Sequence, residues 1–252
     1  MDYTITDSFV LPSQGKIYST EIDPSVTLRT MTTAEEMRRM SQTDYPYKAM
    51  SEIIKACMVE GPKLSPYDMC IGDYLFLLYK LRLVTYGSEY SLSSTCPYCM
   101  HTNNDTIDLK DLLVLEYEDD IMNFASFDLP QTKQHVEIKF QTPRMLDTIA
   151  EKGREFNKKT KDKSIDPNML YTLSTMIKTV DGDVPDPILI EEWVRQLPML
   201  DTQTILAYAD RLNNSIGLQR VLDVECDICG LMYSSSFRLN NEFFRPTLHI
   251  WW

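Results

Sequence analysis

Two C-x-x-C pairs are the residues of this 252-residue chain whose types and spacing can do chemistry. Cys96 pairs with Cys99 and Cys226 pairs with Cys229, and 126 residues lie between the two pairs. Two cysteines separated by two residues can wrap around one metal ion, and a tetrahedral zinc ion is completed by four thiolates. The pattern predicts one zinc site with all four cysteines as ligands. The residues between the pairs would then form an insertion closed at its base by the metal.

Other chemistry of a C-x-x-C pair is less well supported here. Redox pairs sit at a helix N-terminus, which lowers the thiol pKa, whereas both pairs here are flanked by strand-like segments. An iron–sulfur cluster and a metal-free site remain alternatives. Four thiolates leave no open metal position for catalysis, so a structural role is expected. His101 is a spare ligand that four cysteines make unnecessary, and Cys57 and Cys70 are interpreted as buried core thiols.

Composition limits the class of protein. The chain has 43% hydrophobic and 25% charged residues, which is typical of a globular protein. It contains no run of ~18 apolar residues, so no membrane helix is expected. The N-terminus lacks a basic-then-apolar signal pattern, so the protein is expected to stay in a cytoplasm, where C-x-x-C pairs favour metal. The net charge of −12 argues against binding nucleic acid.

The charge is unevenly distributed. Residues 105–128 contain eight acidic side chains and one lysine, whereas residues 151–163 contain six basic and three acidic side chains. Such runs are usually solvated faces. The alternative interpretation is electrostatic complementarity with protein neighbours.

Periodicity and capping signals predict an α+β protein, mainly helical, with short antiparallel strands that form a four-cysteine zinc-ribbon-like clasp. Thr32 followed by Glu35 is a capping box that predicts a helix from about 33 to 40. Further helices are expected at about 47–59, 67–86, 142–160, 167–179, 186–197 and 202–213, and strands on both sides of each C-x-x-C pair. The expected divisions are an extended arm (1–32), a helical region with the first knuckle (33–119), a strand hairpin with a helical insertion (120–219), and the second knuckle with an aromatic tail (220–252).

Signals of catalysis are missing from the sequence. There is no Gly-rich phosphate loop, and the three histidines are scattered without a nucleophile pattern. Asp181-Gly182-Asp183 begins like a calcium loop, but the prolines that follow break that geometry, and a turn is expected. The sequence therefore predicts a protein that is not an enzyme.

The last ten residues are rich in apolar and aromatic side chains. Two interpretations remain open for this tail: it docks on its own domain, or it anchors a partner, as buried Trp and Arg do at binding hot spots.

The segment 9–18 (FVLPSQGKIY) resembles the F-x-L-P-S-x-G-x-x-Y opening of T4-like bacteriophage baseplate hub and hub-assembly proteins. Gly72-Asp73 before an apolar helix, Leu81-Arg82 and Cys96-Pro97-Tyr98-Cys99 fit the same pattern. The resemblance covers residues 8–110 well, and the second knuckle and 243–246 more loosely.

The resemblance implies a non-enzymatic tail protein, a structural subunit or assembly factor of the baseplate hub, stabilised by zinc. Its location would be the virion baseplate or the host cytoplasm during assembly. Its partners would be other tail and baseplate proteins, in multiple copies within the assembly, with no nucleic acid or membrane. The expected partner-binding residues are Phe9, Leu11, Phe243, Phe244, Arg245, Trp251 and Trp252. The alternative is a zinc-ribbon adaptor that binds nucleic acid or regulates transcription, although acidic residues crowd both knuckles.

Overall fold

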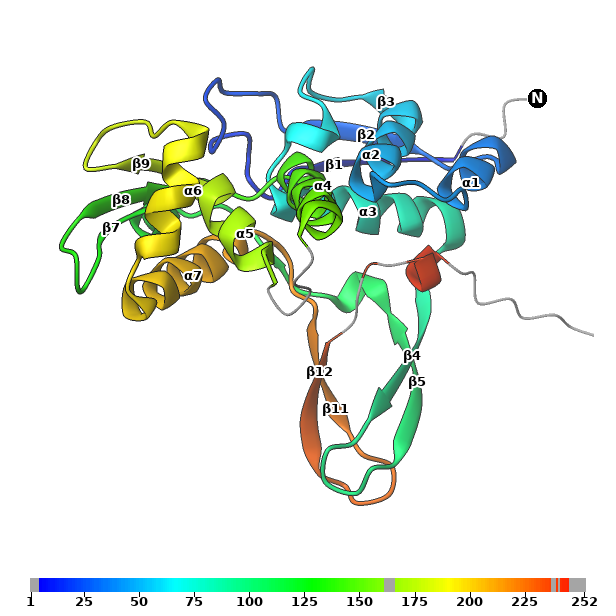
Figure 1. Cartoon of the computed structure of the whole chain (residues 1–252). Helices are drawn as coiled ribbons and strands as arrows, with labels where there is room; N and C mark the ends of the chain where they lie inside the picture. Colours follow the sequence, from blue (N-terminus) through cyan, green and yellow to red (C-terminus); the bar gives the residue numbers. More distant parts are fainter. Residues whose placement is uncertain (1–4, 161–165, 237–238, 240, 245–252) are drawn as a thin grey trace, which may run out of the picture.

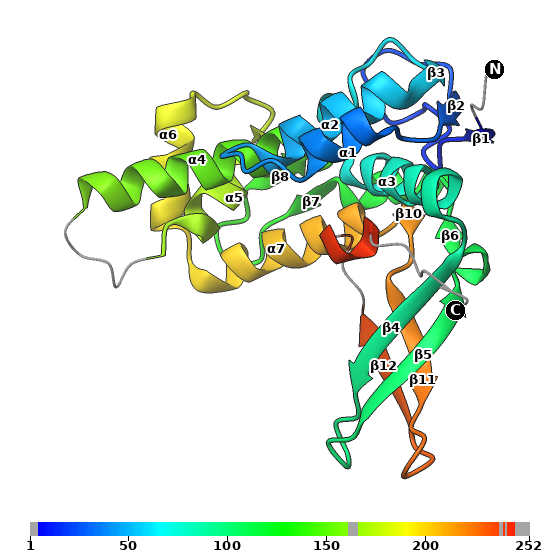
Figure 2. The same ribbon diagram turned by 90° about the vertical axis from the view of Figure 1, so that its right-hand side faces the viewer.

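The structure is a computed structural model that describes residues 5–160, 166–236, 239 and 241–244. It consists of an α+β body from which a stalk of two β-hairpins projects (Figure 1). A view from the side shows the same two hairpins projecting side by side from the body (Figure 2). Among the described residues, no helix is both long enough and apolar enough to cross a membrane.

One half of the body surrounds helix α3 (Ile71–Tyr86). Buried side chains on several sides of this helix, including Leu77 and Leu81, place it at the centre of the first hydrophobic core. A three-stranded antiparallel sheet in the order β1-β2-β3 and two helices pack around it. These elements are β1 (Thr6–Val10), β2 (Ser25–Arg29), α1 (Thr33–Arg39), α2 (Pro46–Cys57) and β3 (Met58–Glu60).

The other half of the body has its own core around a second antiparallel sheet, in the order β7-β8-β9. Its strands are β7 (Ser126–Asp128), β8 (His135–Ile138) and β9 (Ile177–Val180). Its helices are α4 (Pro143–Lys159), α5 (Asn168–Met176), α6 (Pro187–Gln196) and α7 (Met199–Asn213). The apolar faces of α5, α6 and α7 contribute to this core, so each sheet has its own helical cover.

The stalk is built from segments that are far apart in the sequence. Its first hairpin pairs β4 (Glu89–Thr95) with β5 (Thr102–Asp108), and its second pairs β11 (Val221–Glu225) with β12 (Met232–Ser236). Next to the body, β6 (Val114–Leu115) pairs with β10 (Gly217–Leu218), which ties the chain after the first hairpin to the chain before the second.

A buried carboxylate fixes the N-terminal segment to helix α3. Asp73 is fully buried and accepts hydrogen bonds from the Ser13 backbone N–H (3.0 Å), the Ser13 hydroxyl (2.5 Å) and the Tyr18 hydroxyl (2.6 Å). Burial raises the pKa of Asp73, and these hydrogen bonds oppose that rise. Ser13, Tyr18 and Asp73 all belong to the motifs that resemble baseplate proteins. These motif residues therefore stabilise the fold by joining the N-terminal segment to α3.

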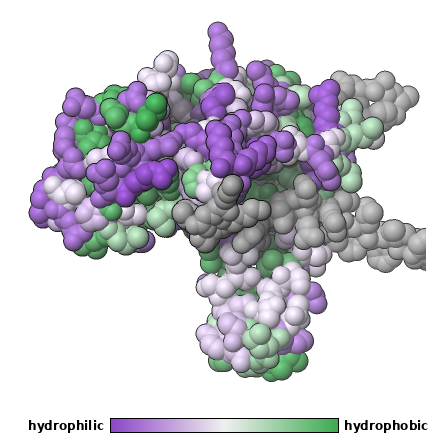
Figure 3. Space-filling model, viewed as in Figure 1, coloured by the Kyte–Doolittle hydropathy of each residue, from purple (hydrophilic) through white to green (hydrophobic). Residues whose placement is uncertain are grey.

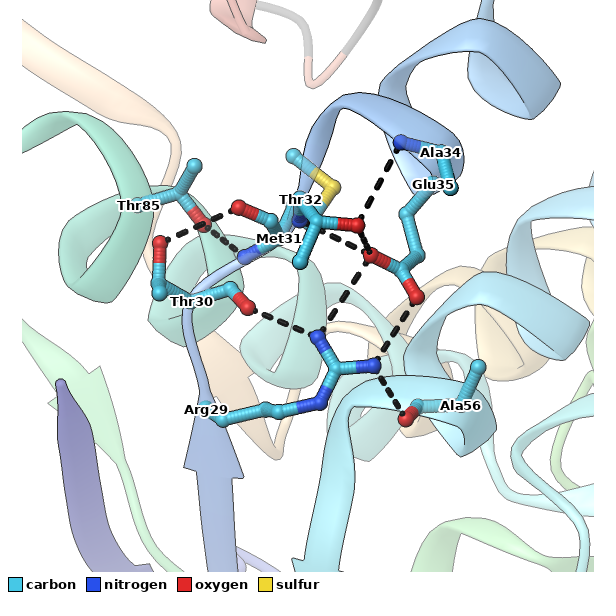
Figure 4. Close-up of polar contacts among 8 residues, drawn as sticks. All are labelled: Arg29, Thr30, Met31, Thr32, Ala34, Glu35, Ala56 and Thr85. Carbon is cyan, nitrogen blue, oxygen red and sulfur yellow. Dashed lines mark hydrogen bonds and ion pairs between the residues drawn. The ribbon is translucent and has the colours of Figure 1, made fainter. Parts of the chain in front are cut away.

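Helix α1 begins with the capping box that the sequence predicts. The Thr32 hydroxyl accepts from the Ala34 N–H, and the Thr32 N–H donates to the Glu35 carboxylate (2.8 Å). Arg29 at the end of β2 pairs with the same carboxylate and also donates to the Ala56 carbonyl in α2 (Figure 4). The hydrogen bond with Arg29 lowers the pKa of Glu35 to about 2, so the carboxylate stays ionised and links β2, α1 and α2.

Two glycines bring helix α3 into backbone contact with β10. A Cβ atom on Gly72 would lie 2.4 Å from the Ile216 carbonyl oxygen, and one on Gly217 would lie 2.9 Å from the Gly72 Cα. Gly217 also has a φ of 102°, a conformation that favours glycine. Gly72 is therefore required by close packing between helix α3 and the chain at β10, the strand that leads to the second hairpin.

The predicted α+β class with short antiparallel strands is confirmed. Several boundaries differ from expectation. The helix expected at about 67–86 begins at Ile71, and the helix expected at about 202–213 begins at Met199. Two other expected helices end early. The helix expected to reach 179 ends at Met176, because Ile177–Val180 pair with β8 as a strand. The helix expected at about 47–59 ends at Cys57, because Met58–Glu60 pair with β2 as a strand. In both cases tertiary strand pairing overrides the helical periodicity.

The Gly72 contact predicts that Gly72→Ala destabilises the protein by about 2 kcal/mol or more, since the new Cβ meets rigid backbone. The matched control is Gly153→Ala in α4. There the nearest atom is the Asn168 side-chain oxygen at 3.2 Å, which can move, so stability should be unchanged or rise by up to about 1 kcal/mol. Urea denaturation measures the free energy of unfolding of both variants. Equal effects of the two substitutions would contradict the proposed contact.

Candidate metal centre

The two C-x-x-C turns have the same backbone construction at the far end of the stalk. Cys96 N–H donates to the His101 carbonyl (2.8 Å), and Cys226 N–H donates to the Leu231 carbonyl (3.1 Å). The residue after the second cysteine of each pair donates back to the first: Met100 to Cys96 and Gly230 to Cys226. Both residues have positive φ, 61° for Met100 and 67° for Gly230. Each turn is a knuckle, and the two knuckles face each other.

The knuckles bring all four cysteines together. Their Sγ atoms lie within 4.8 Å of one another. Cys96 Sγ lies 3.7 Å from Cys229 Sγ, and Cys99 Sγ lies 3.5 Å from Cys226 Sγ. A tetrahedral zinc ion with Zn–S bonds of about 2.3 Å places its sulfurs about 3.8 Å apart, whereas a disulfide is far shorter. The four-sulfur arrangement therefore fits a tetrahedral metal ion.

The electrostatics of the cluster favour a cation. Backbone N–H groups of Cys229 and Ile228 lower the pKa of Cys226 to about 6. At Cys99 a backbone N–H from His101 acts in the same direction, but partial desolvation and the three neighbouring thiols raise its pKa to about 12. The two shifts differ because one thiolate in the cluster makes the next harder to form. A divalent cation among the sulfurs removes that conflict by stabilising every thiolate.

A buried polar network joins the two hairpins below the cysteines. The Tyr233 hydroxyl on β12 accepts from the Asn103 side-chain amide on β5 (2.8 Å) and lies 2.7 Å from the Ser94 hydroxyl on β4. The Asn103 oxygen accepts from the Asp227 N–H at 3.4 Å, within the second knuckle. Leu92 and Val224 are buried nearby. The hairpins are thus packed together before they reach the knuckles, which sets the spacing of the four sulfurs.

The two knuckles with the cysteines lie at the far end of the stalk (Figure 1). The expectation that the metal closes the base of an insertion is therefore wrong about the position of the cluster. The base is instead held by Arg82 in α3, which is fully buried. Its guanidinium donates to the carbonyls of Gly87 and Glu89, before and at the start of β4, and to that of Phe243 after β12. Burial lowers the pKa of Arg82. One cation therefore ties α3 to the start of the first hairpin and to Phe243, which lies seven residues after the second hairpin.

The structure places part of the predicted partner-binding set inside the protein. Leu11, Phe243 and Phe244 are buried, and Phe9 is half-buried against Phe76. Phe243 also packs against Tyr90 at the root of the stalk, with ring centroids 5.5 Å apart. Arg245, Trp251 and Trp252 lie outside the described residues. A role of these seven residues in partner binding stays a prediction.

Sequence reasoning missed four residues that position the site: Ser94, Asn103, Tyr233 and Arg82. The signal for Ser94 and Asn103 is their place in short strands, where every second residue faces the same side. Arg82 belongs to the Leu81-Arg82 motif of the family resemblance, but the motif does not indicate a buried role, because an arginine in an apolar helix usually reaches solvent.

The fold and the site define an α+β protein with a four-cysteine cluster at the end of a β-hairpin stalk. The family model described as T4 bacteriophage base plate protein matches residues 4–245 of the chain. The chain therefore belongs to this family, and the predicted resemblance is confirmed at that level. No curated protein and no solved structure matches it.

The polar network predicts that Tyr233→Phe loosens the stalk. The substitution leaves Asn103 and Ser94 without their shared partner in a buried interface, which costs about 1–3 kcal/mol. Hydrogen exchange of the β5 and β12 amides should accelerate accordingly. Tyr98→Phe removes the same atom from an exposed side chain in the first knuckle and should change nothing. Indistinguishable exchange in the two variants would argue against the network.

Proposed function

We propose that this protein is a non-enzymatic structural component of the phage baseplate, acting in the hub or in its assembly through protein–protein contacts. Membership of the base plate family supports the baseplate role. In a baseplate, its partners are other tail proteins and its location is the virion tail.

We propose further that one zinc ion is held by Cys96, Cys99, Cys226 and Cys229. The observation that carries this proposal is the packing of four Sγ atoms within 4.8 Å. Four thiolates in a tetrahedron are the ligand set of structural zinc, and they leave no position open for substrate. When bound, the ion cross-links the two knuckles. The chain's own residues set the sulfur spacing through the Tyr233 network and turn backbone N–H groups toward Cys226.

The zinc proposal predicts one zinc ion per chain by elemental analysis of purified protein. Cys96→Ser and Cys226→Ser should each abolish zinc binding and lower stability to a similar extent, because each opens the same site. Cys57→Ser is the matched control, since Cys57 is a buried core thiol outside the cluster and its loss should leave zinc bound. Stoichiometric zinc in Cys96→Ser, or no zinc in the unmodified protein, would refute the assignment.

The position of the cluster makes the effect of zinc removal local. Structural zinc in small finger peptides contributes roughly 10–16 kcal/mol of apparent binding free energy. Most side chains of the two hydrophobic cores, however, lie in the body and not in the stalk. Chelation should therefore increase hydrogen exchange at 96–101 and 226–231 while α3 and α7 remain protected. Loss of protection in α3 and α7 at the same chelator concentration would show that the metal supports the whole fold.

The baseplate role predicts that mass spectrometry finds the chain in tail-protein complexes from infected cells. A structural subunit is also found in purified virions, whereas an assembly factor is found only in the cell extract. Its absence from every tail-protein complex would contradict the proposal.

A further inference from the structure

The knuckles present apolar side chains to solvent at the end of the stalk. These are Tyr98, Met100, Ile228, Leu231 and Met232, each between 49% and 74% exposed. They come from the two knuckles and from the first residue of β12, which the cysteine cluster holds together. They therefore share one surface, here called the tip. In the space-filling view, hydrophobic colour gathers at this end of the stalk, below a middle section of weakly polar residues (Figure 3). Clustered apolar exposure of this kind marks an interaction surface more often than scattered single residues do.

The turn geometry does not account for the apolar side chains. Met100 and Gly230 occupy equivalent positions in the two knuckles, and both have positive φ. The left-handed conformation costs an L-residue about 1 kcal/mol, which glycine avoids. The second knuckle uses glycine there, whereas the first keeps a methionine that is 74% exposed. A strained backbone that carries an exposed apolar side chain points to a use for that side chain.

The charge of the stalk restricts what the tip binds. Segments 89–108 and 221–236 contain six acidic residues and no Lys or Arg. These are Glu89, Asp105, Asp108, Asp223, Glu225 and Asp227. Four thiolates around a divalent cation add a net charge of about −2. Phosphate backbones, anionic lipid and the tip of a second copy would all be repelled.

We propose that the tip inserts into an apolar pocket rimmed by Lys or Arg on another protein of the tail assembly. This inference rests on the proposed baseplate function and names the partner surface for it. Apolar contacts of the tip supply affinity, and the acidic stalk pairs with the basic rim. The seven-residue strands hold the tip roughly 23 Å from the body, at about 3.3 Å per residue. The body therefore need not touch the protein that receives the tip.

The test compares tail-protein complexes purified from cells infected with phages that carry variant forms of the full chain. Met100→Gly suits the left-handed backbone, and Met100→Gly with Ile228→Ser removes more of the tip. The matched control is Val184→Ser with Ile188→Ser, which removes two equally exposed apolar side chains from the body. Zinc content and melting temperature of each purified variant confirm that the stalk is intact.

We expect the double tip variant to co-purify with tail proteins at least about tenfold less than the unmodified chain, Met100→Gly to show a smaller loss, and the body control to show none. Association of the unmodified chain should also weaken as salt rises. Equal recovery of Met100→Gly, of the zinc-bound double tip variant and of the unmodified chain would overturn the proposal.

A photo-crosslinking amino acid at position 228 gives a second, independent measurement in infected cells. The expected crosslink lies on a different tail protein, among apolar residues flanked by Lys or Arg. Crosslinks to nucleic acid, to lipid or to a second copy of this chain would each overturn the inference. If the unmodified chain does not co-purify with tail proteins, the baseplate proposal itself fails, and the crosslink still decides what the tip contacts.

Discussion

The buried guanidinium of Arg82 is the constraint on which the stalk depends. It lies in the middle of the apolar helix α3 and donates to three backbone carbonyls, one of which follows the second hairpin. Carbonyl oxygens offset the desolvation of the cation only if all of them stay in place, because an unpaired buried charge is strongly unfavourable. The segment that enters β4 and Phe243, seven residues after β12, are therefore held to the same helix by a single side chain. The pairing of β6 with β10 adds a second tie between the two hairpins at the body.

The far end of the stalk needs a different kind of stabilisation. A two-stranded hairpin is marginally stable alone, and the interface between these two hairpins buries few apolar residues, such as Leu92 and Val224. The Tyr233 network adds hydrogen bonds, but each contributes only about 1 kcal/mol net. A metal held by both knuckles supplies cross-linking that so thin an interface cannot. The buried side chains of the stalk continue the first hydrophobic core, with Arg82 at the base of the stalk and the four cysteines at its far end.

Much of this architecture follows from local signals in the sequence. The Thr32 capping box and Pro143 mark where α1 and α4 begin, because these signals act within one helical turn. The C-x-x-C spacing predicts which four sulfurs meet. It does not predict where they meet, because that depends on the length and direction of the flanking strands. The burial of Phe243 and Phe244 also cannot be predicted from the sequence. Apolar residues near a chain end are compatible with packing in the protein's own core and with binding to a partner.

The motifs that identify the family act mainly in the body of the protein. Ser13, Tyr18 and Asp73 form one buried network, Gly72 permits a backbone contact, and Arg82 holds the stalk. The fold constrains each of these residues, because each satisfies a buried polar group or a steric limit. They therefore identify the family without describing what one member binds. Binding specificity is better sought at positions where packing does not dictate the residue type. Tyr98 and Ile228 at the tip are such positions, because their side chains are exposed. Each lies between two cysteines, and the backbone of the turn, not the side chain, sets the geometry of the site.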